Sequence, residues 1–334
     1  MLLSFFRKSQ ILAIFAIVIV LAAIWIKTFF NGITYPFIFD SINMPLYSIV
    51  AKYLKPELLY TKLTVVAFIL SIAFYLLHLN GKYIIIKQRT YIPALLFIII
   101  SSAFTPIQRV NPAVFAGLFI TIALDHIFAI YQKHSPLDNL FRAGISLGIA
   151  SLFYAPAITI YLLLFVSLSI LRSFNAKEWF VSILGIILPW GVLLLINLWL
   201  QIGFSETVGM VSHNLITPTQ SSIDELIPIV FTSAIGLPTL VAIIYMIPSM
   251  ANQKISVRKF QNIFFWLLLL SVSSFVIFST CSYEIAYIAA IPLSFQLGNY
   301  FTTAKGKFWP EVLFMLIFIA ALAVQLYPIF VDFI

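Results

Sequence analysis

The sequence holds a single cysteine, Cys281, and this scarcity excludes several kinds of site. One cysteine rules out an internal disulfide and any metal site built from several thiolates. The four histidines are scattered and do not form the HExxH spacing of zinc enzymes. Walker A, GxSxG and CxxC motifs are absent from the sequence as well. We therefore expect no metal and no cofactor.

Charge is also scarce. Only 9% of the residues are charged, against roughly 25% in an ordinary soluble domain. With 62% hydrophobic residues and a mean hydropathy of +1.09, the chain has more apolar surface than a soluble core absorbs, so lipid is its expected solvent. The apolar runs are long and continuous, which favours helices over a membrane barrel. The expected fold is an all-α polytopic membrane protein, a single integral membrane domain over residues 1–334.

The net charge of +8 indicates topology, because the lysines and arginines gather in short loops between apolar runs. No basic and aromatic patch indicates nucleic acid, and no nucleic-acid partner is expected. Arg7 and Lys8 precede the first run, which we interpret as an uncleaved anchor with its N-terminus inside. The expected location is the cytoplasmic (inner) membrane, crossed several times.

The apolar runs predict about eleven membrane-spanning helices. The run at 143–153 is too short to span alone at about 1.5 Å per residue, unless Pro156 turns the chain inside the bilayer. The expected helices lie near residues 11–30, 60–79, 91–104, 113–131, 143–153, 156–171, 179–200, 226–247, 261–280, 285–300 and 309–330.

The first external loop, residues 31–58, carries Asp40 and then an amphipathic segment. Asn43 is suited to cap a helix and Pro45 to its first turn, so we expect a helix lying on the membrane surface. Asp40 is either a solvated loop carboxylate or a general base at the outer face. The apolar face of this helix would hold Leu46, Ile49, Val50, Tyr53 and Leu54, and the polar face Ser48, Lys52 and Lys55.

Other polar residues are expected on the same outer side. A tight loop holds Arg109 and Asn111, and Glu284 follows the ninth span. The second sizeable external loop, residues 201–225, holds Glu206 and His213 and is long enough to fold over a site. Arg109 and Lys52 either contact lipid headgroups or bind a lipid phosphate, for which arginine is well shaped.

Two features lie within the spans. Asp125 and His126 sit near the inner end of the fourth span, where they either relay protons or are structural, extending to the interface or pairing with Arg142 across the loop. Gly144-x-x-x-Gly148 matches a helix-packing motif, which predicts close packing of that helix.

Several stretches, taken as a series, resemble the polyprenyl-phosphate-sugar-dependent (GT-C type) membrane glycosyltransferases. In that family an acidic residue follows the first span and a surface helix comes next, as Asp40 and the segment after it do here. The whole chain is also similar to a family of bacterial integral membrane proteins to which no activity is attached. The matching stretches are Phe39-Asp40 to Ala51, Asn111-Pro-Ala-Val-Phe-Ala, Arg142 to Leu152, Leu188-Pro189-Trp190, and Tyr283 to Pro292.

The resemblance implies a GT-C-like core and the transfer of a sugar from a polyprenyl-phosphate carrier to an acceptor at the outer face of the membrane. Asp40 would match the catalytic carboxylate, and Arg109 would lie near the carrier phosphate. Two positions depart from the family pattern: Asn111 stands where an acid is common, and Ser282 stands where arginine precedes Tyr283. The expected substrate-binding residues are Arg109, Asn111, Lys52, Tyr47, His213 and Glu284.

Two other functions are open at this point. A transporter or lipid flippase would depend on Asp125 and His126, although no convincing internal repeat supports it. A non-enzymatic subunit of a cell-envelope complex would account for the absence of strong motifs.

Overall fold

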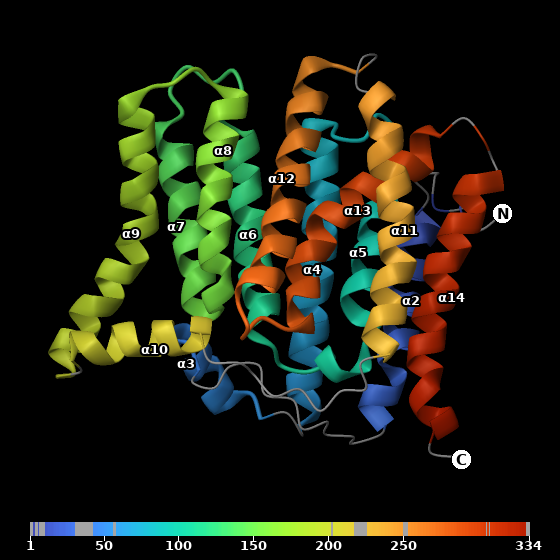
Figure 1. The fold of residues 1–334 in the computed structure, drawn as a ribbon, viewed down its shortest axis with the longest axis horizontal. Coiled ribbons are helices and arrows are strands. Elements are labelled where there is room, and N and C mark those ends of the chain that lie inside the picture. The colour runs from blue at the N-terminus through green and yellow to red at the C-terminus, as the bar shows by residue number, and fades with distance from the viewer. Residues whose placement is uncertain are drawn as a thin grey trace.

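The computed structural model describes residues 3, 6, 11–30, 43–55, 58–201, 203–216, 226–249, 253–304, 306 and 308–331, and within these every regular element is a helix. The longer helices run along a common axis, and α3 and α10 lie at one end of the bundle (Figure 1). The α-helices are α2 (Ile11–Phe30), α3 (Pro45–Tyr53), α4 (Leu59–Tyr83), α5 (Ile92–Ser102), α6 (Pro112–Phe128), α7 (Leu137–Phe153), α8 (Tyr161–Leu171), α9 (Ala176–Trp199), α10 (Phe204–Ile216), α11 (Leu226–Ser249), α12 (Ile255–Ile277), α13 (Ala286–Thr303) and α14 (Phe308–Val331). Three 3₁₀ turns join them: η1 (Thr105–Ile107), η2 (Ala155–Ile160) and η4 (Tyr283–Ile285).

The fold is that of a helical membrane protein. Among the described residues, six helices are long and apolar enough to cross a membrane, namely α2, α4, α9, α11, α12 and α14. Shorter apolar helices, α5, α6 and the η2–α8 segment, pack among them. Each of the apolar runs identified in the sequence is helical in the structure. The bundle interior is formed by α5, α6 and α13, whose residues are buried along most of their length.

The two ends of the bundle differ in charge. The basic clusters expected inside lie at the end opposite α3 and α10, with Lys87 and Arg89 in the turn after α4 and Arg258 and Lys259 at the start of α12. The carbonyl of Phe6 accepts hydrogen bonds from Thr90 Oγ1 and the amide of Tyr91, so the start of the chain meets that same end. The ends are called below the α3/α10 end and the basic end.

The short helix α5 ends inside the bundle, and its last carbonyls are satisfied by side chains. Gln325 of α14 donates to the carbonyl of Ala103 and, at 3.4 Å, to that of Ser102. Gln108 also donates to the Ser102 carbonyl, and Thr28 of α2 donates in turn to the Gln108 side-chain oxygen. Carbonyls at a helix end need such partners because lipid supplies none.

Glycines bring α7 and α9 into direct backbone contact, which confirms the packing use of the Gly144-x-x-x-Gly148 motif. A Cβ added at Gly144 would lie 2.8 Å from the carbonyl oxygen of Ser182, and one at Gly148 would lie 2.8 Å from that of Ile186. The partner on α9 is itself a glycine, because a Cβ at Gly185 would lie 2.5 Å from the oxygen of Phe141. Small residues permit such close approach of membrane helices.

Helix α7 is longer than the expected 143–153 segment, because it begins at Leu137. Arg142 pairs with Asp138 one turn earlier, with Nε 3.0 Å from Oδ1, and this spacing supports the extra helical turns. Seventeen residues rise about 25 Å, so α7 crosses most of the bundle without a turn at Pro156.

The expected pairing of Asp125 with Arg142 is wrong. Asp125 Oδ1 lies 2.7 Å from Lys82 Nζ of α4, and Arg142 is engaged with Asp138. Two tyrosine hydroxyls of α4 also donate to the Asp125 carboxylate, at 2.7 and 3.1 Å. Lys82 is the partner of Asp125 because it faces this carboxylate from the neighbouring helix α4 at the basic end. The tyrosines are Tyr83 and Tyr75.

The helix expected after the first span is confirmed as α3, with a correction to its start. Met44, not Asn43, occupies its N-cap, and no side-chain oxygen caps it, so Pro45 at the first position starts the helix. Its buried residue is Tyr47, whereas Ile49 and Tyr53 of the expected apolar face are exposed. The residues 201–225 are not all loop, because Phe204–Ile216 form α10.

Candidate functional site

The site is built around the loop from η1 to the start of α6, at the α3/α10 end. Asn111 caps α6: its backbone is extended, and its side-chain oxygen accepts from the amide of Ala113 at 2.8 Å. Asn111 is fully buried, and its amide nitrogen Nδ2 has no hydrogen-bond partner among the described residues. A helix N-terminus carries partial positive charge, and a buried amide donor beside it adds to the attraction for an anion.

Tyr47 docks α3 onto this loop. Its hydroxyl donates to the carbonyl of Val110 at 3.2 Å, and its ring lies 6.5 Å from that of Phe115 on α6. Tyr47 is only 7% exposed. The surface helix is thereby held directly against the residues that start α6.

Glu284 lies in η4 and is fully buried. Its Oε1 accepts from the Tyr154 hydroxyl and from the amide of Ser282, both at 2.9 Å, and its Oε2 accepts from the Ser282 hydroxyl. Cys281 Sγ is 3.2 Å from the same Tyr154 hydroxyl. Burial raises the pKa of the Glu284 carboxyl, and these hydrogen bonds to the ionised form oppose the rise only in part.

Arg109 interacts electrostatically with both Tyr47, beside the start of α6, and Glu284 in η4. It is partly buried, with Nε and one Nη shielded from solvent. Burial lowers the pKa of its guanidinium, while the charges of Tyr47 and Glu284 favour the protonated form. Tyr287 of α13 donates to the carbonyl of Ile107 at 3.0 Å, which ties the Glu284 segment to the Arg109 loop. Chemically, the arrangement offers a cation and an amide donor beside a buried carboxyl.

Of the expected substrate-binding residues, Tyr47, Arg109, Asn111 and Glu284 therefore share one region, defined here as the Arg109 site. Two others do not join it directly. Lys52 lies on the exposed side of α3, and the His213 side chain is exposed on α10. The Ser279 hydroxyl donates to the carbonyl of Ile216 at 2.8 Å, so the end of α10 does meet the segment that leads to Glu284. The proposed catalytic residue, Asp40, lies outside the described residues.

The sequence reasoning missed Tyr154, the hydrogen-bond partner of Glu284 from the end of α7. Its position directly before Ala155-Pro156 marked the interruption between two helices, where a side chain can turn toward a neighbour. A search for groups of three or more His, Cys, Asp or Glu able to hold a metal finds none among the described residues.

Comparison with protein families identifies the chain. The model of DUF6427, described as a family of unknown function, matches residues 49–330, and the protein belongs to this family. No curated protein and no solved structure matches the chain.

Proposed function

We propose that this DUF6427 member is a glycosyltransferase of the cytoplasmic membrane that takes its sugar from a polyprenyl-phosphate carrier. One observation carries the proposal: the cation Arg109 and the unpartnered, fully buried Nδ2 of Asn111 lie together at the N-terminus of α6. A cation beside an amide donor that lacks an acceptor among the described residues suits a phosphate, which offers several acceptor oxygens and negative charge. The site lies beneath the surface helix α3, where a lipid phosphate resides.

In the proposed architecture, the shorter helices α5, α6, α7, α8 and α13 cross the membrane together with the six long ones and form a GT-C-like core of about eleven spans. The basic end faces the cytoplasm, because basic turns favour that side. The N-terminus then lies inside, since Phe6 contacts the Thr90–Tyr91 segment at that end. The Arg109 site faces outward, toward an external acceptor.

The proposed reaction is a single displacement. An acceptor hydroxyl attacks the anomeric carbon, the bond from that carbon to the phosphate oxygen breaks, and the acceptor proton passes to Asp40. Polyprenyl phosphate leaves with the bonding electron pair, and Arg109 and Asn111 stabilise its charge. Phosphate is a good leaving group at neutral pH, so the reaction needs no general acid.

The phosphate contact is tested by binding of polyprenyl monophosphate to the purified protein in nanodiscs, with polyprenol as the matched lipid. Asn111→Asp keeps a capping oxygen for α6 but replaces the Nδ2 donor with a negative oxygen. We expect it to lose at least tenfold in affinity for the phosphate, with little change in melting temperature and none in polyprenol binding. Arg109→Gln should act in the same direction, and Lys55→Ala, which removes an exposed cation just after α3, should not. Equal affinity of wild type and Asn111→Asp would contradict the phosphate site.

Catalysis is tested separately with Asp40→Asn. The variant should insert and bind polyprenyl monophosphate as the wild type does, yet no longer transfer sugar to the cell envelope. A glycan profile unchanged from the wild type would contradict the transferase proposal.

The contacts of Asp125 give less support to a transporter. Both of its carboxylate oxygens are engaged, by Lys82, Tyr83 and Tyr75, which favours a structural role at the basic end. A role as a subunit of an envelope complex would be favoured if the phosphate lipid binds but no transfer occurs.

A further inference from the structure

We propose that α10 is an interfacial helix whose apolar side is immersed among the lipid acyl chains at the rim of the bundle. This inference concerns the position of the bilayer surface and is independent of the proposed reaction. Helix α10 lies across the end of the bundle, at a steep angle to the helices that run along its axis (Figure 1). Such an orientation is typical of helices in the plane of a membrane interface.

The side of α10 that faces the protein is partly polar. Thr207 and Asn214 are its buried residues. Asn197 of α9 donates to the Thr207 hydroxyl at 2.9 Å, which joins the two helices. At its other end α10 is held by the bond from Ser279 to the Ile216 carbonyl. The helix is therefore anchored at both ends, and Val211 and Leu215 pack against the core between these anchors.

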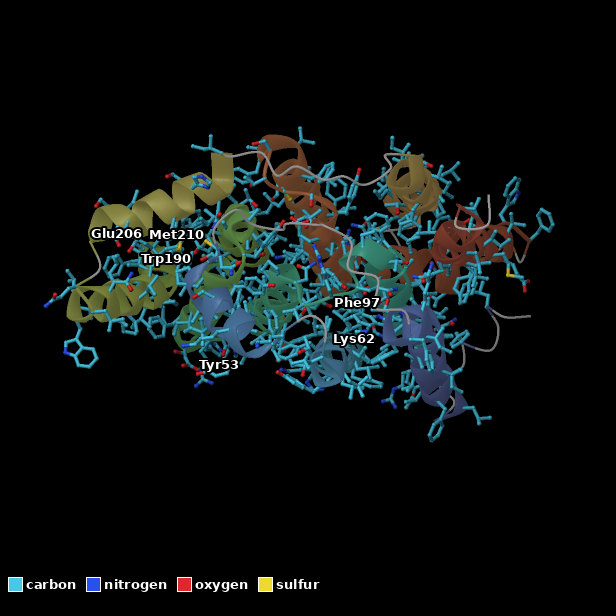
Figure 2. All side chains as sticks on the ribbon, turned by 90° about the horizontal axis from the view of Figure 1, so that it is seen from below. Tyr53, Lys62, Phe97, Trp190, Glu206 and Met210 are labelled. Atoms are coloured by element: carbon cyan, nitrogen blue, oxygen red, sulfur yellow. The ribbon has the colours of Figure 1, made fainter. Side chains whose placement is uncertain are left out.

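Part of the apolar side of α10 remains exposed. Phe204 and Val208, one turn apart, remain 64% and 49% exposed. Glu206 is about 160° from Val208 around the helix axis, since successive residues are about 100° apart. In Figure 2, Glu206 and Met210 lie on the α9 side of α10, and Glu206 is exposed there. The Phe204 and Val208 side is therefore the exposed edge of an apolar stripe whose other members, Val211 and Leu215, pack against the core.

In water, exposure of this side would be unfavourable, at about 25 cal/mol for each Å² of apolar surface. The neighbouring surface shows what covers it. Helix α9, which is long and apolar enough to cross a membrane, leads into α10, and its last residues Leu195, Leu198 and Trp199 are 66–85% exposed. The apolar side of α10 continues this surface, so the same bilayer covers both. Trp199 at the end of α9 fits the interfacial position that tryptophan prefers.

The inference places the membrane boundary at the level of α10. Because the end of α10 contacts Ser279 of the segment leading to Glu284, the Arg109 site lies close to the depth of the lipid headgroups. A phosphate held there would need little displacement from its position in the bilayer.

Site-directed spin labelling tests the position of α10. Val208→Cys and Glu206→Cys are each labelled in nanodiscs of phosphatidylethanolamine and phosphatidylglycerol. The unsubstituted chain serves as control, because its one cysteine, Cys281, is buried and should not react. Accessibility to oxygen, which concentrates in the acyl chains, is compared with accessibility to a water-soluble nickel chelate. The two substitutions lie on exposed positions of the same helix and differ only in the side they report.

We expect the label at Val208 to favour oxygen by severalfold and the label at Glu206 to favour the nickel chelate. Phe204→Cys provides a second reporter on the apolar side and should behave as Val208→Cys does. If all three labels favour the chelate, α10 lies in water and the inference is overturned. A Val208 label shielded from both reagents would mean that protein rather than lipid covers this side, and would overturn it equally.

Discussion

The contact between α7 and α9 gives the most quantitative prediction, because an added methyl group has almost no space there. In Gly185→Ala the new Cβ would lie 2.5 Å from the Phe141 oxygen and 3.1 Å from the Gly144 Cα. An ordinary contact begins at 3.4 Å, so the shortest distance must grow by 3.4 − 2.5 = 0.9 Å. The opposing atoms belong to the backbone, so the helices must move apart as units.

Overfilling a packed interface costs about 1–3 kcal/mol. Against this, replacing glycine by alanine within a helix stabilises it by about 1 kcal/mol. The chain offers a matched control in the same helix, because a Cβ at Gly191 would meet no atom within 4 Å. Gly191→Ala has the same gain in helix propensity without the clash. The two variants should therefore differ by about 1–3 kcal/mol in stability.

The assay is thermal unfolding of the purified protein in detergent, followed by the loss of monodisperse protein on size-exclusion chromatography. We expect Gly185→Ala to melt several degrees below Gly191→Ala. Gly117→Ala, whose Cβ would make only an ordinary contact at 3.6 Å, should resemble the control. If Gly185→Ala is as stable as Gly191→Ala, then α7 and α9 do not approach each other as described.

Three further predictions concern ionisable groups. Lys82→Met should lower the melting temperature, because it leaves the Asp125 carboxylate without its cation. Adding Asp125→Asn should restore much of this loss. A double mutant whose destabilisation equals the sum of the two single mutants would refute the pairing. Because burial raises the folded-state pKa of Glu284, its ionisation opposes folding, so stability should fall as pH rises above the ordinary glutamate value of about 4.3 and through the folded-state pKa. Glu284→Gln should make melting temperatures between pH 4 and 8 less pH-dependent, and an unchanged slope would assign the dependence to another group. Arg172→Lys should destabilise the protein nearly as much as Arg172→Ala, since Arg172 serves Glu178 and two backbone carbonyls at once; full stability of the lysine variant would exclude that role.

The helical content was accessible from the sequence because the apolar runs are long and uninterrupted. Every expected run is a helix, and α3 follows the first of them as Pro45 indicated. The sequence-based expectation fails where polar and apolar residues are mixed along a short segment. The sequence of Phe204–Ile216 indicates a loop because it mixes Ser, Thr, Asn and Gly with apolar residues, although the segment is helix α10.

The candidate site was accessible only in part. Arg109, Asn111 and Glu284 were identified by their place just outside apolar runs, and the structure gathers them with Tyr47. The partnership of Glu284 with Tyr154 joins residues 130 positions apart and depends on how α7 packs against the α12–α13 connection. Asp125 shows the same limit, since Lys82 and Arg142 were both plausible partners by sequence and only the packing of α4 on α6 selects Lys82.

The capping of α5 by Gln325 has a consequence for the order in which the protein folds. Helix α5 forms early in the chain, but its final carbonyls are completed by a side chain that lies 222 residues farther along, in α14. During synthesis the end of α5 must therefore rely on Gln108 until α14 arrives. Docking of α14 supplies the hydrogen bond from Gln325 to the Ala103 carbonyl. Completion of the bundle interior thus depends on a helix synthesised long after α5, and a substitution that displaces α14 would destabilise the end of α5.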